Sequence, residues 1–177
     1  MRISSRSTVT TISRASRGLD VFIDTQLWVY AFKKPQRRGF ESEEKYKEAL
    51  KIHEKANNFL YEALTKHTIY VTTHQLAELY HALAFRGARM EPRKALAIIE
   101  DIVNSTRTVI VEVRKKHYRE ALRLSTISGI HVWDYLCIVP LKGLIDVAYT
   151  NDKHFLHATI RSLVPRIENP VGKWLEI

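Results

Sequence analysis

Short runs of apolar and β-branched residues alternate along this chain with longer segments that have helical spacing. We expect strands at Leu19–Ile23, Thr68–Val71, Thr108–Val113 and Ile145–Tyr149, with Leu163–Ile167 as a candidate fifth strand. We expect helices at Leu27–Phe32, Glu43–Thr65, Thr72–Arg86, Pro92–Asn104, Lys115–Ile127 and Trp133–Leu141. Strands that alternate with helices form a parallel sheet that is covered on both faces. The sequence therefore predicts a single α/β domain, with a central parallel sheet of four to five strands flanked by helices on both faces.

Three local signals mark where helices begin and end. Thr72 and Gln75 match a capping box, which indicates that a helix begins after the second strand. Pro92 suits the first turn of a helix, where its missing N–H is not needed. Pro140 lies inside the segment Trp133–Leu141 and should kink or end that helix.

The net charge of the chain is +9, which suits a polyanionic partner such as nucleic acid. Part of this charge lies in residues 1–18, which contain four arginines, many serines and threonines, and no acid. We expect residues 1–18 to form a disordered basic arm and residues 19–177 to form the folded domain. An arginine- and serine-rich, acid-free start is also typical of organelle transit peptides.

Two aspartates directly follow predicted strands. Asp24 comes after the first strand, in FIDTQLW, and Asp152 comes after the fourth, in AYTNDKHF. Parallel sheets bind ligands beyond the carboxyl ends of their strands, so both positions are candidate site positions. Each also has an ordinary structural explanation, because aspartate caps helices and Asn-Asp sequences form turns. Asp146, inside the fourth predicted strand, is expected to lie away from the edge.

Two further acids lie on predicted helices beside apolar residues. Glu78, in TTHQLAELYHAL, is in line with Ala82 and Phe85, and Asp134, in VWDYLCIVPL, has Cys137 and Ile138 one helical turn further on. A carboxylate on an apolar face needs a cation, hydrogen bonds or a proton. A solvated glutamate and a helix N-cap are the structural alternatives for these two residues.

All four acids can reach one edge of the predicted sheet. Without a counter-charge, each pair of carboxylates would repel by about 4 kcal/mol at 4 Å and an effective dielectric of 20. Such a cluster is favourable when it holds a hard divalent cation, and oxygen ligands favour Mg²⁺ or Mn²⁺. We therefore predict a metal site that is formed by Asp24, Glu78, Asp134 and Asp152.

The segments FIDTQLW, TTHQLAELYHAL, WDYLCIVPL and YTNDKHF resemble the successive motifs of the PIN-domain family, in the same order and spacing. The resemblance covers about residues 19–170 and is closest to VapC-like toxins and their archaeal relatives. It implies a parallel sheet on which the four acids bind Mg²⁺ or Mn²⁺ and hydrolyse RNA. Thr25 and Thr150 match the hydroxyl residues that accompany the first and last acids in that family.

This sequence departs from the family pattern in two places. Gln26 stands where the family often has asparagine or serine, so a polar contact beside the first acid is expected to differ. Leu136 and Pro140 replace the small residues that are common after the third acid, so that helix is expected to pack differently. Neither departure removes a metal ligand.

Other kinds of site find less support. His74 and His81, and His154 and His157, have spacings that occur in zinc sites, but no HExxH motif accompanies them, and we interpret them as surface histidines. Cys137, the one cysteine, excludes an internal disulfide and a CxxC metal site, and it is expected to be an inert core residue. No P-loop or dinucleotide-binding motif occurs. A haloacid-type phosphatase would need a second aspartate at position 26, where Gln26 stands.

The sequence thus predicts a metal-dependent, VapC-like endoribonuclease, with RNA as substrate, a small antitoxin protein as a candidate partner, and a homodimer. The alternatives are a PIN nuclease of RNA processing and a non-catalytic PIN scaffold. Because no apolar run approaches the ~20 residues of a membrane span, a cytoplasmic protein without a membrane partner is expected. Four cations after the first helix are candidate contacts to the RNA backbone, although a solvated charge run would look the same: Lys33, Lys34, Arg37 and Arg38.

Overall fold

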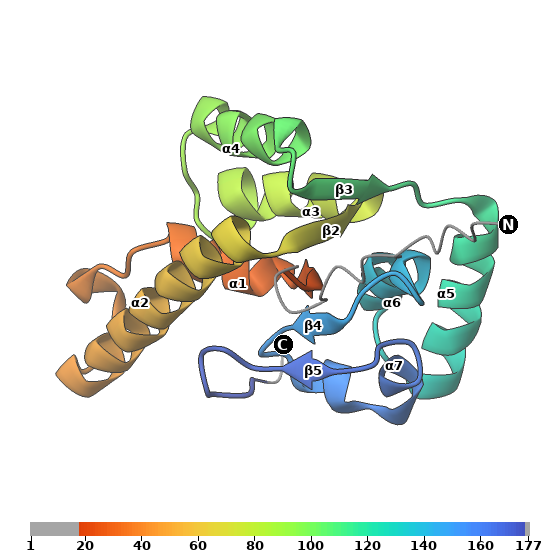
Figure 1. Ribbon diagram of the computed structural model, residues 1–177. Coiled ribbons are helices and arrows are strands. Elements are labelled where there is room, and N and C mark those ends of the chain that lie inside the picture. The colour runs from red at the N-terminus through yellow and green to blue at the C-terminus, as the bar shows by residue number, and fades with distance from the viewer. Residues whose placement is uncertain (1–17, 176–177) are drawn as a thin grey trace, which may run out of the picture.

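Five parallel strands form one central sheet in the computed structural model, which describes residues 18–175 (Figure 1). The basic arm expected at residues 1–18 therefore lies outside the described residues, apart from Gly18. The strand order is β3-β2-β1-β4-β5, and every pairing is parallel. The strands are β1 (Asp20–Ile23), β2 (Thr68–Thr72), β3 (Thr108–Val111), β4 (Val147–Tyr149) and β5 (Ile167–Glu168). The prediction of a parallel sheet of four to five strands is confirmed.

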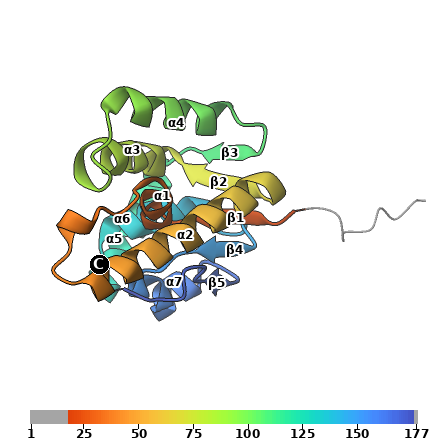
Figure 2. The same ribbon diagram turned by 90° about the vertical axis from the view of Figure 1, so that its left-hand side faces the viewer.

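Helices cover both faces of the sheet, as predicted (Figures 1 and 2). One face carries α1 (Thr25–Phe32), α2 (Glu43–Lys66), α3 (Thr73–His81) and α4 (Pro92–Asn104), with the short turns η2 (Arg37–Gly39) and η3 (Ala82–Arg86). The other face carries α5 (Lys115–Ser128), α6 (Val132–Ile138), α7 (Ala158–Arg161), η4 (Val139–Leu141) and η5 (Lys153–Leu156).

The core consists of two layers that are separated by the sheet. Alternate residues of a strand point to opposite faces, and β1 shows this clearly. Val21 and Ile23 pack into the cluster beneath α1 to α4, whereas Phe22 packs into the cluster beneath α5 to α7. All three side chains are fully buried. This explains why the first strand reads as a continuous apolar run and not as an alternating one.

Successive strands are added to the sheet first on one side of β1 and then on the other. From β1 it proceeds to β2 and then to β3 at one edge, and it returns to place β4 on the other side of β1. Ligands of open α/β sheets bind beyond the carboxyl ends of the strands at such a switch point. Here the switch point lies between the ends of β1 and β4, which are at Ile23 and Tyr149.

Several expected boundaries shift in the structure. β4 begins at Val147, so Asp146 precedes the strand instead of lying inside it. Its Oδ2 accepts a 3.0 Å hydrogen bond from the backbone N–H of Asp20, the first residue of β1. Asp146 therefore lies at the opposite end of the sheet from the switch point. β5 starts at Ile167, the residue at which the candidate fifth strand was expected to end, because α7 and a turn occupy the residues before it.

The bounds of α3 and α6 differ from their predictions. α3 ends at His81 and continues as a single π-helical turn, Ala82–Arg86. Pro140 does interrupt its helix, because α6 ends at Ile138 and Pro140 lies in a separate 3₁₀ turn. Only half of the expected capping box forms: the Gln75 N–H donates to Thr72 Oγ1 at 3.1 Å, but the Gln75 side chain turns to the Ile23 carbonyl.

No helix within residues 18–175 is long and apolar enough to cross a membrane.

The turn that leads into α6 gives a test of the fold. Gly129 ends α5 in the left-handed conformation, with a φ of 75°. Because an L side chain is strained there, Gly129→Ala should cost about 1 kcal/mol and lower the melting temperature by ~2–4 °C. Gly39→Ala is the control, since Gly39 has neither a left-handed φ nor an atom within 4 Å of an added Cβ. Equal melting temperatures for both variants would contradict this assignment.

Candidate active site

Asp24 lies at the end of β1, at the switch point of the sheet. Its N–H donates to the Tyr149 carbonyl at 2.9 Å, which extends the pairing of β1 with β4 by one residue. Asp24 occupies the N-cap position of α1, but its carboxylate makes no capping hydrogen bond. Instead, its Oδ2 accepts a 2.6 Å hydrogen bond from Thr150 Oγ1, at the end of β4. The carboxylate is thus held by the neighbouring strand, and its place at the N-cap of α1 does not by itself explain its position.

The loop after β4 brings Asp152 to the same place. The Asp152 N–H donates to Thr150 Oγ1 at 3.0 Å, so one threonine hydroxyl links the first and last acids. Asp152 Oδ1 also accepts from the His154 N–H at 2.8 Å and caps η5. The turn role expected as an alternative is therefore real, but it uses only one oxygen. Asp152 is 5% exposed, which is unusual for a turn aspartate.

Asp134 lies in the first turn of α6, one of the helices on the α5–α7 face of the sheet. His131 is the N-cap of this helix, and Asp134 follows it in the first turn without capping it. Asp134 Oδ2 is buried and has no hydrogen-bond partner within residues 18–175. Nδ1 of His154 lies 3.5 Å from this oxygen and 3.5 Å from Asp152 Oδ2. The imidazole of His154 therefore stands between two of the predicted acids.

Glu78, on α3, is half-buried and faces Cys137 on α6. The Cys137 thiol donates to Glu78 Oε2 at 3.4 Å, and burial raises the pKa of this thiol well above its usual value, helped by the charge of Glu78. The thiol therefore stays protonated, and the prediction of a buried, inert cysteine agrees with the structure. His74, one turn before Glu78, offers a third potential ligand atom within 4.8 Å of these two groups.

The four acids influence one another electrostatically. The pKa of Asp24 is raised to about 7, chiefly by burial; the hydrogen bond from Thr150 lowers it, and the charges of Glu78 and Asp152 raise it. Burial also raises the pKa of Asp134 to about 8, together with the charges of Asp24, Asp152 and Glu78. Within residues 18–175, the only basic side chain within 4.0 Å of these carboxylates is His154. Burial and mutual repulsion therefore favour the protonated forms of Asp24 and Asp134 in this cluster.

Within residues 18–175, two groups of side chains could hold a divalent cation. Asp134, Asp152 and His154 form one and His74, Glu78 and Cys137 form the other, while Asp24 belongs to neither. Asp134 offers a buried oxygen without a hydrogen-bond partner, and Asp152 and His154 place ligand atoms within 4.8 Å of Asp134. Carboxylate oxygens are the ligands that Mg²⁺ and Mn²⁺ prefer, and a cation would offset the repulsion that raises the pKa values of Asp24 and Asp134.

The two predicted threonines differ in their contacts. Thr150 is fully buried and joins Asp24 to Asp152, as described above. Thr25 is also buried, but its Oγ1 has no hydrogen-bond partner within the described residues. Thr25 directly follows Asp24, so this buried hydroxyl lies next to the first acid in the chain.

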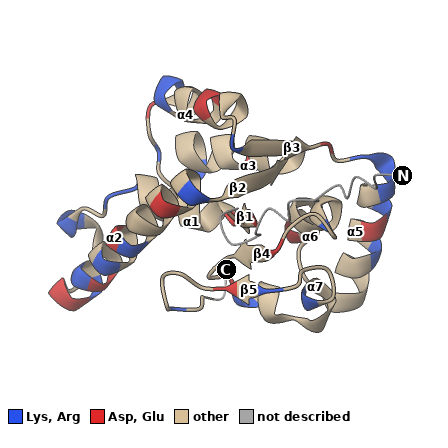
Figure 3. Ribbon diagram, viewed as in Figure 1, with Lys and Arg blue, Asp and Glu red and all other residues tan. Residues whose placement is uncertain are grey.

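The four predicted RNA-backbone cations do not behave alike. Arg37 forms a 2.8 Å ion pair with Glu43 and binds the Phe40 carbonyl, so its role is local. Lys33 donates to the Gly87 carbonyl at 2.5 Å. Lys34 and Arg38 are exposed and have no ion-pair partner within residues 18–175. Figure 3 shows basic positions following α1 and along α2, and an acidic position on α6.

The sequence reasoning missed two residues of this region. His154 was expected at the surface, but it is half-buried between Asp134 and Asp152. His154 follows Asp152 by two residues in the same loop, and this spacing could have identified it as a neighbour of the site. His74 was also expected at the surface, whereas it is half-buried, stacks on Trp133 with ring centroids 5.2 Å apart, and has a buried Nε2. His81 and His157 are exposed, as predicted.

Comparison with known proteins gives similarity in structure but not in sequence. No protein-family model matches the chain, and no curated protein matches it by sequence. Among solved structures, a chain of VapBC2 from Rickettsia felis, bound to a DNA fragment from its promoter, matches with a TM-score of 0.53 and 19% identity. That match covers 85% of this chain and 98% of the other chain.

VapC20 from Mycobacterium tuberculosis, a toxin that cleaves the sarcin–ricin loop, matches with a TM-score of 0.56 and 18% identity. The match covers 77% of this chain and 92% of VapC20. At this level of identity the likeness concerns the fold. The chain therefore has a VapC-like PIN-domain fold, as the sequence motifs indicated.

The raised pKa values predict how stability depends on pH in the absence of metal. The unfolded chain releases the protons of Asp24 and Asp134 near pH 3.8, but the folded protein keeps them until about pH 7 and 8. Folding is therefore favoured by these groups at low pH, and that contribution is lost progressively as the pH rises from 3.8 to about 8, where the folded protein also releases these protons. Asp134→Asn should flatten this dependence and raise the melting temperature at pH 8.5 by at least ~2–4 °C.

Asp146→Asn is the matched control for these thermal melts, which are run in chelator. Asp146 is an exposed aspartate at the opposite end of the sheet, and asparagine keeps an acceptor for the Asp20 N–H. We expect its pH profile to follow that of the wild type. Identical profiles for all three proteins would mean that the acids do not share one site.

Proposed function

We propose that this protein is a metal-dependent endoribonuclease of the VapC type, which hydrolyses phosphodiester bonds of RNA. The observation that carries the proposal is the gathering of Asp24, Glu78, Asp134 and Asp152 at the switch point of a VapC-like fold. The net charge of +9 adds a long-range attraction for a polyanionic substrate.

The roles of the residues follow from their surroundings. Asp24, Asp134 and Asp152 would hold Mg²⁺ or Mn²⁺, and Glu78 would complete the ligand set or orient the attacking water. A bound divalent cation would activate that water and neutralise charge on the scissile phosphate. Thr150 positions Asp24 and the loop of Asp152 through its two hydrogen bonds. The Thr25 hydroxyl is buried and has no hydrogen-bond partner within residues 18–175, so we give it no role in catalysis beyond its place next to Asp24.

A non-catalytic scaffold explains the acidic cluster less well. Burying several carboxylates next to one another costs folding free energy, and a bound cation that keeps them ionised offsets that cost. A PIN nuclease of RNA processing would use the same residues, so the site itself does not separate it from a toxin. The likeness to VapBC2 favours the toxin and supports a small antitoxin as a partner, which a neighbouring gene would encode.

The remaining parts of the proposal rest on composition and fold. We propose a homodimer and a cytoplasmic location, as in a VapC-like toxin. Residues 1–18 would form a basic arm that adds to the attraction for RNA, while the nuclease domain comprises residues 19–177. Gly18, the first described residue, already lies against the end of α2, since an added Cβ would meet the Lys66 carbonyl oxygen.

An RNA cleavage assay tests the proposed activity. The full-length protein should cut single-stranded RNA in Mg²⁺ or Mn²⁺ and lose this activity in excess EDTA. Asp24→Asn and Asp134→Asn should each reduce the rate by at least ~10²-fold. Asp146→Asn should be nearly neutral. Undiminished cleavage in EDTA, or an essential Asp146 beside a dispensable Asp134, would refute the assignment.

Metal binding gives a second test that needs no substrate. An ion that binds only the folded state stabilises it by RT ln(1 + [L]/Kd), so Mg²⁺ at about 100 times its Kd should add about 2.7 kcal/mol. The melting temperature of the wild type should therefore rise in excess Mg²⁺. Asp134→Asn should show a much smaller rise, while Asp146→Asn should match the wild type. An equal rise in all three proteins would place the ion elsewhere.

A further inference from the structure

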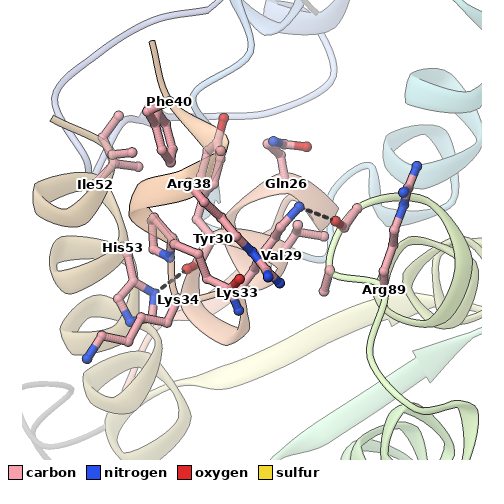
Figure 4. A pocket seen from close by; sticks show the side chains of 16 residues that line it. Gln26, Val29, Tyr30, Lys33, Lys34, Arg38, Phe40, Ile52, His53 and Arg89 are labelled. Carbon is pink, nitrogen blue, oxygen red and sulfur yellow. Dashed lines mark hydrogen bonds between the residues drawn. The ribbon is translucent and has the colours of Figure 1, made fainter. Parts of the chain in front are cut away.

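A large hollow lies along α1, the helix that begins directly after Asp24 (Figure 4). Its volume is about 890 Å³, and we call it the α1 pocket. Helix α1 forms its base, η2 and the first half of α2 form one wall, and the segment Gly87–Arg89 forms the other. The pocket lies outside the four acids, and the proposed catalytic step gives it no role.

The charge of the α1 pocket is entirely positive. Four basic side chains line it, namely Lys33, Lys34, Arg38 and Arg89, and no aspartate or glutamate is among the lining residues. Lys33 is bound to the Gly87 carbonyl, but Lys34, Arg38 and Arg89 have no ion-pair partner within residues 18–175. The neighbouring Arg37 is paired with Glu43 and does not line the pocket. Three cations therefore face this space without a counter-ion from the described part of the chain.

The inner surface of the pocket is apolar and partly aromatic. Tyr30, Phe40 and Ile52 are half-buried and contribute to the lining. A 2.8 Å hydrogen bond between His53 Nδ1 and the Tyr30 carbonyl ties α2 to α1 below them (Figure 4). Flat apolar side chains beside cations are the combination that binds single-stranded nucleic acid, because bases stack on the rings while phosphates meet the charges.

The position of the pocket connects it to the site. Gln26 lines the pocket and follows Asp24 by two residues, in the first turn of α1. The eight residues of α1 span about 12 Å, which is a length that a few nucleotides cover. A strand whose phosphate lies at the four acids would therefore run along α1 toward Lys34 and Arg38.

We infer that the α1 pocket is the subsite for the single-stranded RNA segment next to the scissile phosphate. Lys34, Arg38 and Arg89 hold backbone phosphates, and a base lies on the apolar surface that includes Phe40. This inference rests on the proposed ribonuclease function. A segment of a protein partner would have to be acidic to match the three unpaired cations, whereas RNA carries a phosphate at every nucleotide. Charge complementarity thus favours RNA.

Equilibrium binding of a fluorescein-labelled, unstructured oligoadenylate tests the subsite. The full-length chain carries Asp24→Asn so that the RNA stays intact, and anisotropy is measured across a series of salt concentrations. The triple variant Lys34→Gln/Arg38→Gln/Arg89→Gln should bind at least ~10-fold more weakly and reduce the salt slope by about 2, because each lost phosphate contact removes ~0.7. Its melting temperature shows whether the fold is kept.

A charge-matched control separates the pocket from the overall charge. Lys116→Gln/Lys142→Gln/Arg161→Gln removes three exposed cations from the α5–α7 side of the sheet. These residues do not line the α1 pocket. The control should lower affinity by no more than ~2-fold, through long-range attraction alone. Equal losses in the two triple variants would overturn the inference.

Phe40→Leu isolates the contribution of the ring. It keeps an apolar side chain but removes the stacking surface, so oligoadenylate should bind at least ~5-fold more weakly. Binding of inorganic polyphosphate, which has no bases, should be unchanged. Equal effects on both ligands, or none on oligoadenylate, would show that no base occupies the pocket.

The outcomes also separate this inference from the proposed function. If the wild type cuts RNA but the pocket variants bind like the control, the subsite is wrong and the function stands. If the wild type does not cut RNA but the pocket variants bind oligoadenylate more weakly than the control does, the proposed function fails and the RNA-binding site stands. If the pocket variants still bind oligoadenylate but no longer bind the protein encoded by the neighbouring gene, the pocket holds a protein partner and the inference is overturned.

Discussion

The pairing of β1 with strands on both of its sides holds the rest of the molecule in place. Val21, Phe22 and Ile23 are fully buried and supply both layers of the core. At the end of this strand the Ile23 carbonyl accepts two side-chain hydrogen bonds, from Gln75 Nε2 at 2.7 Å and from Trp28 Nε1 at 3.1 Å. These bonds tie the starts of α1 and α3 to the point where β1 ends. Asp24 is the next residue, so these contacts also restrain the position of its backbone.

The proposed site buries neighbouring carboxylates at the end of β1, which is electrostatically unfavourable for their ionised forms. Asp24 and Asp134 are held in surroundings that favour their protonated forms, and their pKa values rise to about 7 and 8. Thr150 opposes the effect at Asp24 by donating to its carboxylate. His154 lies beside Asp134 and Asp152 and gives those two acids a polar neighbour. Because metal binding would require deprotonated carboxylates, we expect affinity for a cation to increase as the pH rises through this range.

Sequence reasoning predicted the sheet and most helix boundaries because the apolar periodicity is strong. Pro92–Asn104 was predicted with the same bounds that the structure has, since proline marks its start and a clear stripe defines its length. The weaker predictions concern ends of elements. Asp146 was placed inside a strand because Ile145–Tyr149 is a continuous apolar segment apart from that residue, and only pairing with β1 shows where β4 begins. Gln75 was expected to close a capping box, but the buried Ile23 carbonyl competes for its side chain.

The sequence by itself determined the elements, the order of the acidic residues and the basic charge. Each of these depends on local spacing or on composition, which need no knowledge of distant contacts. Only the tertiary structure decided which side chains meet. Thr150 joins Asp24 across 126 positions of the chain, His154 turns inward between two carboxylates, and three cations face a shared pocket while Arg37 does not. These outcomes depend on packing between distant segments, because a side chain takes whichever partner the folded chain brings within reach.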